Sequence, residues 1–235
     1  MQSHRAWEIE YNAGRAGKGV SGMRRRMMLV IALLLVLLLA AFACWPRRAD
    51  LRAFDSAGMA QLETAMWRDY YEKRYPALFY HLYEVSRTQF GFSPSDSFRI
   101  ALAAASAAKA FQPTRSRGEA AAALPELAVY YALLRPAAPV AFDTDKLARL
   151  ELDWWQARRE AVGPRDYGRT IAEVAALTYG KSPDDPAIAA SGVARAEAMA
   201  YRDARRSAMT ERDWAEIEVQ LLRAYQFLKV GIGGS

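Results

Sequence analysis

The chain has 235 residues, of which 52% are hydrophobic, and this is enough apolar material for one sizeable core or two small ones. Its formal net charge is +6, but residues 1–26 hold six basic and two acidic side chains and so account for +4 of it. A nucleic-acid-binding surface needs a concentrated basic face, which the rest of the chain lacks, so we expect no nucleic-acid partner. The one cysteine, Cys44, excludes an intrachain disulfide and leaves no cysteine-based metal site or catalytic thiol in the region that follows it.

The first predicted element is an apolar helix over Met27–Trp45, directly after the basic triplet Arg24-Arg25-Arg26. No charge interrupts the segment before Arg47. At about 1.5 Å per residue, a helix of this length spans about 28 Å, close to the hydrocarbon thickness of a bilayer. Trp45 falls at the far edge, where indole rings favour the membrane interface. We therefore expect a single-pass signal-anchor helix whose partner is the lipid bilayer.

The basic residues on either side of this helix predict its orientation. Near its two ends, five precede it and three follow it, namely Arg15, Lys18, Arg24, Arg25 and Arg26 before, and Arg47, Arg48 and Arg52 after. Because positive charge is retained on the cytoplasmic side, residues 1–26 are predicted to be a basic cytoplasmic extension. The remainder of the chain is then periplasmic or otherwise extracytoplasmic, attached to the inner (cytoplasmic) membrane.

Alternative interpretations use the same residues. Ala41-Phe42-Ala43 fits a signal-peptidase site, and cleavage after Ala43 would release a soluble secreted domain. Cys44 suggests a lipoprotein, although Ala41 and Phe42 are poor residues for a lipobox. The long Leu-rich run favours the uncleaved anchor. Met23 would also be a natural first residue for a short signal-anchor protein. Residues 1–22 are then interpreted as a disordered extension, which the native protein either contains or lacks.

Residues 46–53 are predicted to be a short linker, after which the chain is predicted to be all-α. Apolar residues recur at three- and four-residue spacing, without the sustained alternation of a strand. Asp55-Ser56 caps a first helix that runs to about Arg74. Pro76 then breaks or kinks it before a second helix that reaches Phe90.

Two further helices follow before the clearest linker of the chain. Gly91 ends the second helix, and a Ser-Pro-x-Asp segment beginning at Ser93 starts a third that runs to about Phe111. Ser116 and Glu119 have capping-box spacing and predict a fourth helix that continues to Leu134. The proline-rich residues 135–139 then predict a linker.

The helical pattern begins again after this linker. Phe54-Asp55-Ser56 returns 88 residues later as Phe142-Asp143-Thr144, with 7 identities in 21 over residues 54–74. One residue of slippage gives 6 identities in 13 over residues 84–96. We therefore predict two tandem repeats of about four helices each, over 54–135 and 142–230, followed by a flexible tail over 231–235. The period matches no common helical-repeat signature.

Motifs for known chemistry are missing from the sequence. His4 and His81 are the only histidines, so the usual zinc and ferritin-like di-iron sites are excluded. No nucleophile motif and no Gly-rich phosphate loop occurs. We expect no cofactor, no metal and no catalytic residue, and we interpret His81 as a structural residue of its helix.

Glu63 and Glu151 occupy equivalent positions of the two predicted repeats. If they faced one another, a buried carboxylate pair would split its pKa values as acid–base dyads do. The alternative, which we favour, is that each glutamate bonds an arginine or a helix end within its own repeat. Arginines close in sequence are available for this, namely Arg68, Arg74, Arg158 and Arg159.

Aromatic residues form the second candidate site. Trp67, Tyr70, Tyr71 and Tyr75 follow helical spacing, and the matching helix carries Trp154 and Trp155. Trp and Tyr concentrate at binding hot spots, but a stripe at this spacing is more often core. Two adjacent tryptophans cannot both point inward, so one of this pair is predicted to lie at a surface or at a seam between the repeats.

Two functions fit these features. The first is a non-catalytic, membrane-tethered helical-repeat interaction domain, a scaffold or accessory subunit of another membrane protein or complex. The second is an envelope enzyme or ligand-binding domain that uses the groove between the repeats. A groove requires Glu63 and Glu151 to face one concave pocket. A scaffold predicts both to be paired or buried, and it expects an apolar patch on an outer face.

Overall fold

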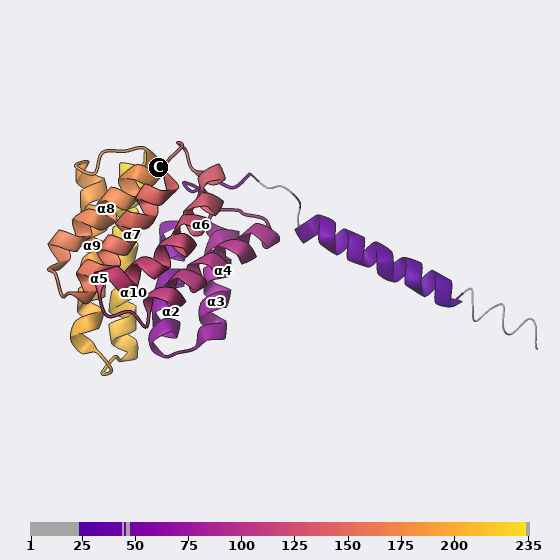
Figure 1. Ribbon diagram of the computed structural model, residues 1–235, viewed down its shortest axis with the longest axis horizontal. Coiled ribbons are helices and arrows are strands. Elements are labelled where there is room, and N and C mark those ends of the chain that lie inside the picture. The colour runs from indigo at the N-terminus through magenta and orange to yellow at the C-terminus, as the bar shows by residue number, and fades with distance from the viewer. Residues whose placement is uncertain (1–23, 44, 46–47, 234–235) are drawn as a thin grey trace, which may run out of the picture. The chain divides into compact units, whose positions relative to one another are not determined.

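The computed structural model describes residues 24–43, 45 and 48–233. It divides into two units, Met1–Trp45 and Pro46–Ser235, each of which is described by itself (Figure 1). Most of the basic extension and Cys44, on which the lipoprotein alternative depends, lie outside the described residues.

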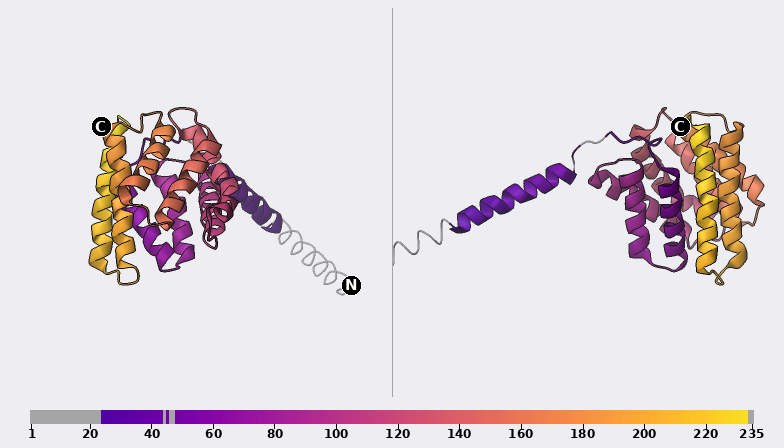
Figure 2. Two further views of the ribbon diagram at one scale, coloured as in Figure 1. Left: turned by 60° about the vertical axis from the view of Figure 1, so that its left-hand side comes forward. Right: turned by 180° about the vertical axis from the view of Figure 1, so that it is seen from behind.

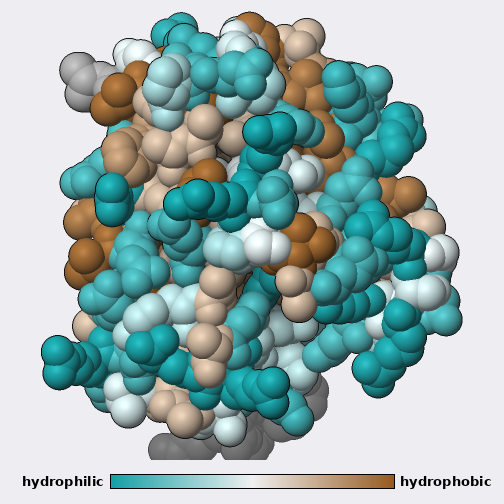
Figure 3. Space-filling view, turned by 90° about the vertical axis from the view of Figure 1, so that its left-hand side faces the viewer, coloured by the Kyte–Doolittle hydropathy of each residue, from teal (hydrophilic) through white to brown (hydrophobic). Residues whose placement is uncertain are grey.

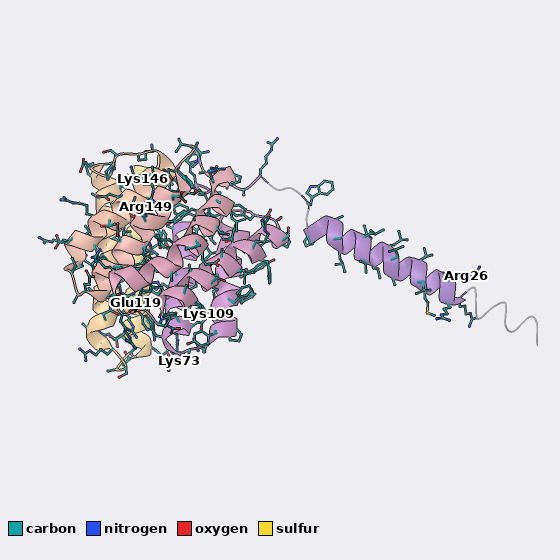
Figure 4. All side chains as sticks on the ribbon, in the orientation of Figure 1. Arg26, Lys73, Lys109, Glu119, Lys146 and Arg149 are labelled. Atoms are coloured by element: carbon teal, nitrogen blue, oxygen red, sulfur yellow. The ribbon has the colours of Figure 1, made fainter. Side chains whose placement is uncertain are left out.

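The described part of the first unit forms one helix, Arg24–Ala43. Its apolar side chains radiate around the whole helix, and Arg26 lies near its N-terminal end (Figure 4). The helix is long and apolar enough to cross a membrane, a property that it shares with signal sequences.

The second unit is built from α-helices joined by short turns, and no strand occurs among its described residues. The all-α prediction is therefore confirmed. A π-helical turn, Val85–Gln89, extends α3, and 3₁₀ turns occupy Ala121–Ala123 and Arg135–Ala137. The α-helices are α2 (Ser56–Tyr71), α3 (Tyr75–Glu84), α4 (Pro94–Phe111), α5 (Arg117–Ala120), α6 (Leu124–Leu134), α7 (Thr144–Arg159), α8 (Pro164–Tyr179), α9 (Pro186–Arg205) and α10 (Glu211–Gly231).

The long helices pack against their neighbours in chain order, and the series closes because α10 packs against α2. Figure 2 shows α9 and α10 side by side and next to the helices of the first half. One core cluster joins α4 and α6 to the buried face of α7, including Leu147 and Leu152. A second joins Phe54, Met59 and Ala60 to residues of α8, α9 and α10. The first helix of each half thus completes the core of the other half.

Local geometry recurs at the spacing of the sequence similarity. Asp55 and Asp143 cap α2 and α7 through their side chains. Lys73 and Ala161 both have positive φ, 57° and 56°, where these helices end. Gly91 also lies in the left-handed region, at φ 76°, a conformation that glycine adopts without a steric cost.

Two predicted features of the helices differ from the structure. In the second half, Ser182-Pro183 corresponds to the Ser93-Pro94 pair that predicts a helix start, but Asp185 caps α9 and Pro186 is its first residue. The predicted helix from Ser116 to Leu134 is also divided. Pro125 has no N–H and its ring clashes with the carbonyl four residues earlier, so α5 and α6 are separated by a 3₁₀ turn. Ser116 caps α5 as predicted, since its Oγ accepts a hydrogen bond from the N–H of Glu119. The Glu119 side chain accepts from the N–H of Arg115 and not from that of Ser116, so the second half of the capping box does not form.

The predicted linker and tail are shorter than expected. Leu51 is buried, and its N–H donates to the carbonyl of Ala137 at 2.9 Å, so the end of the 46–53 segment belongs to the folded unit. At the other end, Gly231 is the last residue of α10 and Ile232 is buried in the second core cluster. Both were expected in a flexible tail, whose last residues, 234 and 235, lie outside the described part.

The outer surface near α8 and α9 is largely hydrophilic. In Figure 3, polar side chains cover most of this face, with apolar residues scattered among them. Scattered surface apolar residues are normal in soluble domains, so this face gives no sign of a large interface.

Gly192 provides a stability test, because it lies where α8 and α9 approach closely. A Cβ at Gly192 would meet the carbonyl of Gly168 and lie 2.7 Å from the backbone nitrogen of Ala172. We expect Gly192→Ala to lower the free energy of unfolding by about 1–3 kcal/mol, the usual cost of overpacking. Gly118→Ala is the control, since its Cβ would meet nothing within 4 Å. Urea unfolding of the full-length protein in detergent, followed by circular dichroism, compares the two, and equal effects would contradict this description.

Candidate functional site

A cavity of about 690 Å³ opens into the helical unit. Its wall is formed by α2, α3, α4, α6 and α7, with one arginine from α9. Most of the lining is apolar or aromatic, with a few polar groups among these side chains. The lining residues are Glu63, Met66, Trp67, Tyr70, Tyr75, Leu78, Phe79, Leu82, Ala104, Ala105, Ala108, Lys109, Gln112, Leu127, Tyr130, Glu151, Trp155 and Arg195.

Glu63 of α2 is almost completely buried, with 2% of its surface exposed. Its Oε1 accepts hydrogen bonds from Nε and Nη2 of Arg195, at 2.9 and 2.5 Å, and its Oε2 accepts one from the hydroxyl of Tyr225. Burial by itself would lower the pKa of Arg195, but the adjacent carboxylate of Glu63 raises it overall. Glu63, Arg195 and Tyr225 therefore form a charged cluster in which both carboxylate oxygens are hydrogen-bonded, and the cluster joins α2 to α9 and α10.

Glu151 of α7 is half-buried and has different partners. Its Oε1 accepts a hydrogen bond from the indole Nε1 of Trp155 at 3.0 Å, and its Oε2 accepts one from the hydroxyl of Tyr131 at 2.8 Å. Both donors are neutral groups. Burial and the nearby Glu151 carboxylate keep the pKa of Tyr131 well above its usual value, so this phenol remains a donor.

The structure brings both glutamates to one cavity, but neither accepts a bond from an arginine of its own predicted repeat. Glu63 bonds Arg195, which is 132 residues away, and Glu151 bonds a tyrosine and a tryptophan. The favoured alternative of a local arginine pair is therefore wrong for both residues. No hydrogen bond joins the two carboxyl groups, so they do not share a proton as an acid–base dyad does.

The predicted aromatic stripe divides between cavity and core. Trp67, Tyr70 and Trp155 line the cavity, together with Tyr75 at its edge. A smaller hollow of about 210 Å³ shares Trp67, Tyr70 and Trp155. Tyr71 does not line the larger cavity; it lines this smaller hollow, and its hydroxyl accepts a hydrogen bond from Arg158.

The two adjacent tryptophans point to different places, as expected. Trp154 is buried in a cluster with Tyr167, Ile171 and Met199. Trp155 is partly buried and its ring contacts Phe111 at a centroid distance of 5.1 Å. Trp155 lines the larger cavity, whereas Trp154 contributes to the smaller hollow alone.

Sequence reasoning missed Arg195 and Tyr130. Tyr130 lines the cavity, and its hydroxyl has no hydrogen-bond partner within residues 24–43, 45 and 48–233. Burial and then the charge of Glu151 raise its pKa. Neither residue belongs to a motif or to a matching pair between the repeats. Only the spatial neighbourhood of Glu63 and Glu151 reveals them.

His81 lies in a separate cluster that connects α2 and α3. Its Nδ1 is 2.7 Å from Oδ2 of the buried Asp69, whose Oδ1 accepts a hydrogen bond from Arg74. This arrangement agrees with a structural role for His81. Among the described residues, no group of three or more His, Cys, Asp and Glu side chains is placed to hold a metal ion.

No protein-family model matches the chain, and no similar curated protein and no similar solved structure was found. Functional inference therefore depends on the geometry of the cavity itself.

Removal of the negative charge of Glu63 is expected to destabilise the protein, whereas removal of an exposed glutamate charge is not. Glu63→Gln leaves the Arg195 guanidinium without its counter-ion in a largely desolvated position, so we expect the free energy of unfolding to fall by about 2–4 kcal/mol. Glu160→Gln is the matched control, since its partner Arg117 and Glu160 itself are both exposed, and we expect almost no change. Urea unfolding of both full-length variants measures this, and a Glu63→Gln protein as stable as the control would refute the role given to the cluster.

Proposed function

We propose that this chain is a membrane-tethered, non-catalytic ligand-binding protein. In this proposal Met27–Trp45 is an uncleaved anchor in the cytoplasmic membrane, with the N-terminus in the cytoplasm and the helical unit on the extracytoplasmic side. Two four-helix repeats, 54–135 and 142–230, then surround a single ligand cavity. The charge balance around the apolar helix and the internal sequence similarity support these parts of the proposal.

The cavity is the observation that carries the proposal. Its volume of about 690 Å³ is within the range of small-molecule sites. Its wall is mostly apolar and aromatic, with few polar groups, which is the usual composition of such sites. Both glutamates face it, as the groove interpretation requires, although both are also hydrogen-bonded, as the scaffold interpretation requires.

The polar groups of the cavity favour binding over catalysis. A general base needs a free proton-accepting atom beside a nucleophile or a substrate position. Both carboxylate oxygens of Glu63 already accept hydrogen bonds, from Arg195 and Tyr225. Among the described residues, no serine, threonine or histidine lines the wall. The polar groups are thus suited to orienting a bound molecule.

A second candidate function, an accessory subunit of a membrane protein complex, is favoured by one surface feature. Phe98 and Leu102 of α4 and Val129 of α6 are each about half exposed, on two helices that pack together. Large exposed apolar groups on neighbouring helices are typical of protein interaction sites. Restriction to the membrane would raise the effective concentration of such a surface toward membrane partners.

Ligand retention tests the first function. We expect full-length protein purified from its native membranes in mild detergent to carry a small molecule that solvent extraction and mass spectrometry detect. Ala105→Trp places an indole in the cavity wall and should abolish this retention, whereas Ala215→Trp, on the exposed side of α10, should preserve it. Equal retention by both variants, or an empty wild-type protein, would argue against a ligand-binding function.

Co-purification tests the second function. If α4 and α6 dock a membrane partner, Phe98→Glu with Leu102→Glu should remove that partner from a mild-detergent purification, because two buried charges oppose association. Val219→Glu on α10 changes an equally exposed apolar residue elsewhere and should leave the partner bound. A wild-type chain that purifies alone rules out a stable complex.

A further inference from the structure

The charge of Glu151 is not balanced within the cavity. Its two oxygens accept hydrogen bonds from Trp155 and Tyr131, which are both neutral donors, and no basic side chain among the described residues forms an ion pair with it. A half-buried carboxylate in an apolar wall is costly unless a positive charge lies close by. The wall therefore contains a negative group without an ion-pair partner among the described residues. Glu151 interacts electrostatically with Arg195, but the ion pair of Arg195 is with Glu63.

The other charged groups of the wall do not remove this imbalance. Arg195 directs Nε and Nη2 to Glu63, so its charge is already matched. Lys109 is exposed, and it forms no ion pair with any residue that the structure describes. The interior charges of Glu63, Arg195 and Glu151 thus sum to one negative charge, which a cation would neutralise.

Aromatic side chains share the cavity with this carboxylate. Trp67, Tyr70, Tyr130 and Trp155 line the same cavity as Glu151. The faces of such rings attract cations within about 6 Å, most strongly when water is excluded, and quaternary ammonium groups are often bound in this way. Beyond the rings, Met66, Leu78, Leu82 and other apolar residues offer a surface for a hydrocarbon body.

An anionic ligand is the principal alternative. Nη1 of Arg195 has no partner among the described residues and could donate to a carboxylate or a phosphate. Such an anion would, however, enter a cavity that already holds the carboxylates of Glu63 and Glu151, and like charges within one cavity repel each other. The balance of charge favours a cation.

On the basis of the proposed ligand-binding function, we infer that the cavity binds an organic ammonium cation. Its charged nitrogen lies beside Glu151 and among the rings of Trp67, Tyr130 and Trp155. Its apolar body lies along the aliphatic wall formed by α2 and α3. The cavity volume of about 690 Å³ accommodates a molecule of this kind.

Three probes of one shape test the inference on the full-length protein in non-ionic detergent. Benzyltrimethylammonium is the cation, neopentylbenzene is its neutral isostere, and 2,2-dimethyl-3-phenylpropanoate is an anion of similar size. Binding is followed by the fluorescence of the wall tryptophans, Trp67 and Trp155. We expect the cation to bind about tenfold more tightly than the isostere and the anion.

Glu151→Gln provides the matched variant, since it removes the charge and keeps the shape. We expect it to weaken binding of the cation about tenfold and to leave binding of the neutral isostere unchanged. The comparison of probes on the wild-type protein stands even if this variant folds poorly.

The outcomes separate this inference from the proposed function. The ammonium assignment is overturned if the cation and the neutral isostere bind equally, or if Glu151→Gln binds the cation as tightly as the wild-type protein does. The ligand-binding cavity then remains. Preferential binding of the anion also overturns it and makes Arg195 the anchor. If none of the probes binds, the assignment is wrong, and the proposed function is then decided by retention in Ala105→Trp.

Discussion

The carboxylate of Glu63 is bonded to side chains that lie 132 and 162 residues further along the chain, and the rest of the helical unit depends on this connection. A buried charge is tolerated only when it is paired and hydrogen-bonded, so α2, α9 and α10 are held where Arg195 and Tyr225 reach both oxygens. Neither half of the chain can satisfy Glu63 without the other. The same cluster forms one side of the cavity, so the constraint on the fold is also a constraint on the site.

Closure of the helix series explains why a cavity exists. The first helix of each half packs in the core of the other half, and α10 packs against α2. Large aromatic side chains from α2, α4 and α7 line the smaller hollow, and Phe111 of α4 makes an edge-to-face contact with Trp155 of α7. Rings in such orientations leave space that the small alanines of α4 do not fill. The cavity is thus a product of packing between the halves.

Local signals allowed much of the fold to be predicted, because they act within a few residues. Asp55 at a helix start, Gly91 at a positive φ and Ser93 before a proline mark boundaries that the structure contains. Pro125 was underestimated, since its effect on the preceding turn competes with the helix propensity of the surrounding alanines.

The site was only partly predictable. Glu63, Trp67, Tyr70, Glu151 and Trp155 line one cavity, but Arg195 and Tyr130 are brought there by tertiary packing, which no short-range pattern records. The repeat architecture stays a prediction.

The chain enters the helical unit through Asp50, Leu51 and Arg52, and this segment is bonded to four separate places. The N–H groups of Asp50 and Leu51 donate to the carbonyls of Phe90 and Ala137, Tyr179 donates to the carbonyl of Leu51, and Lys229 donates to that of Arg52. A truncated chain that starts at Phe54, where the internal similarity begins, would lose all four attachments and the buried Leu51. The autonomous folding unit therefore starts earlier than the similarity. A pulling force applied from the N-terminal side would be shared among both halves at once, and would not peel α2 away by itself.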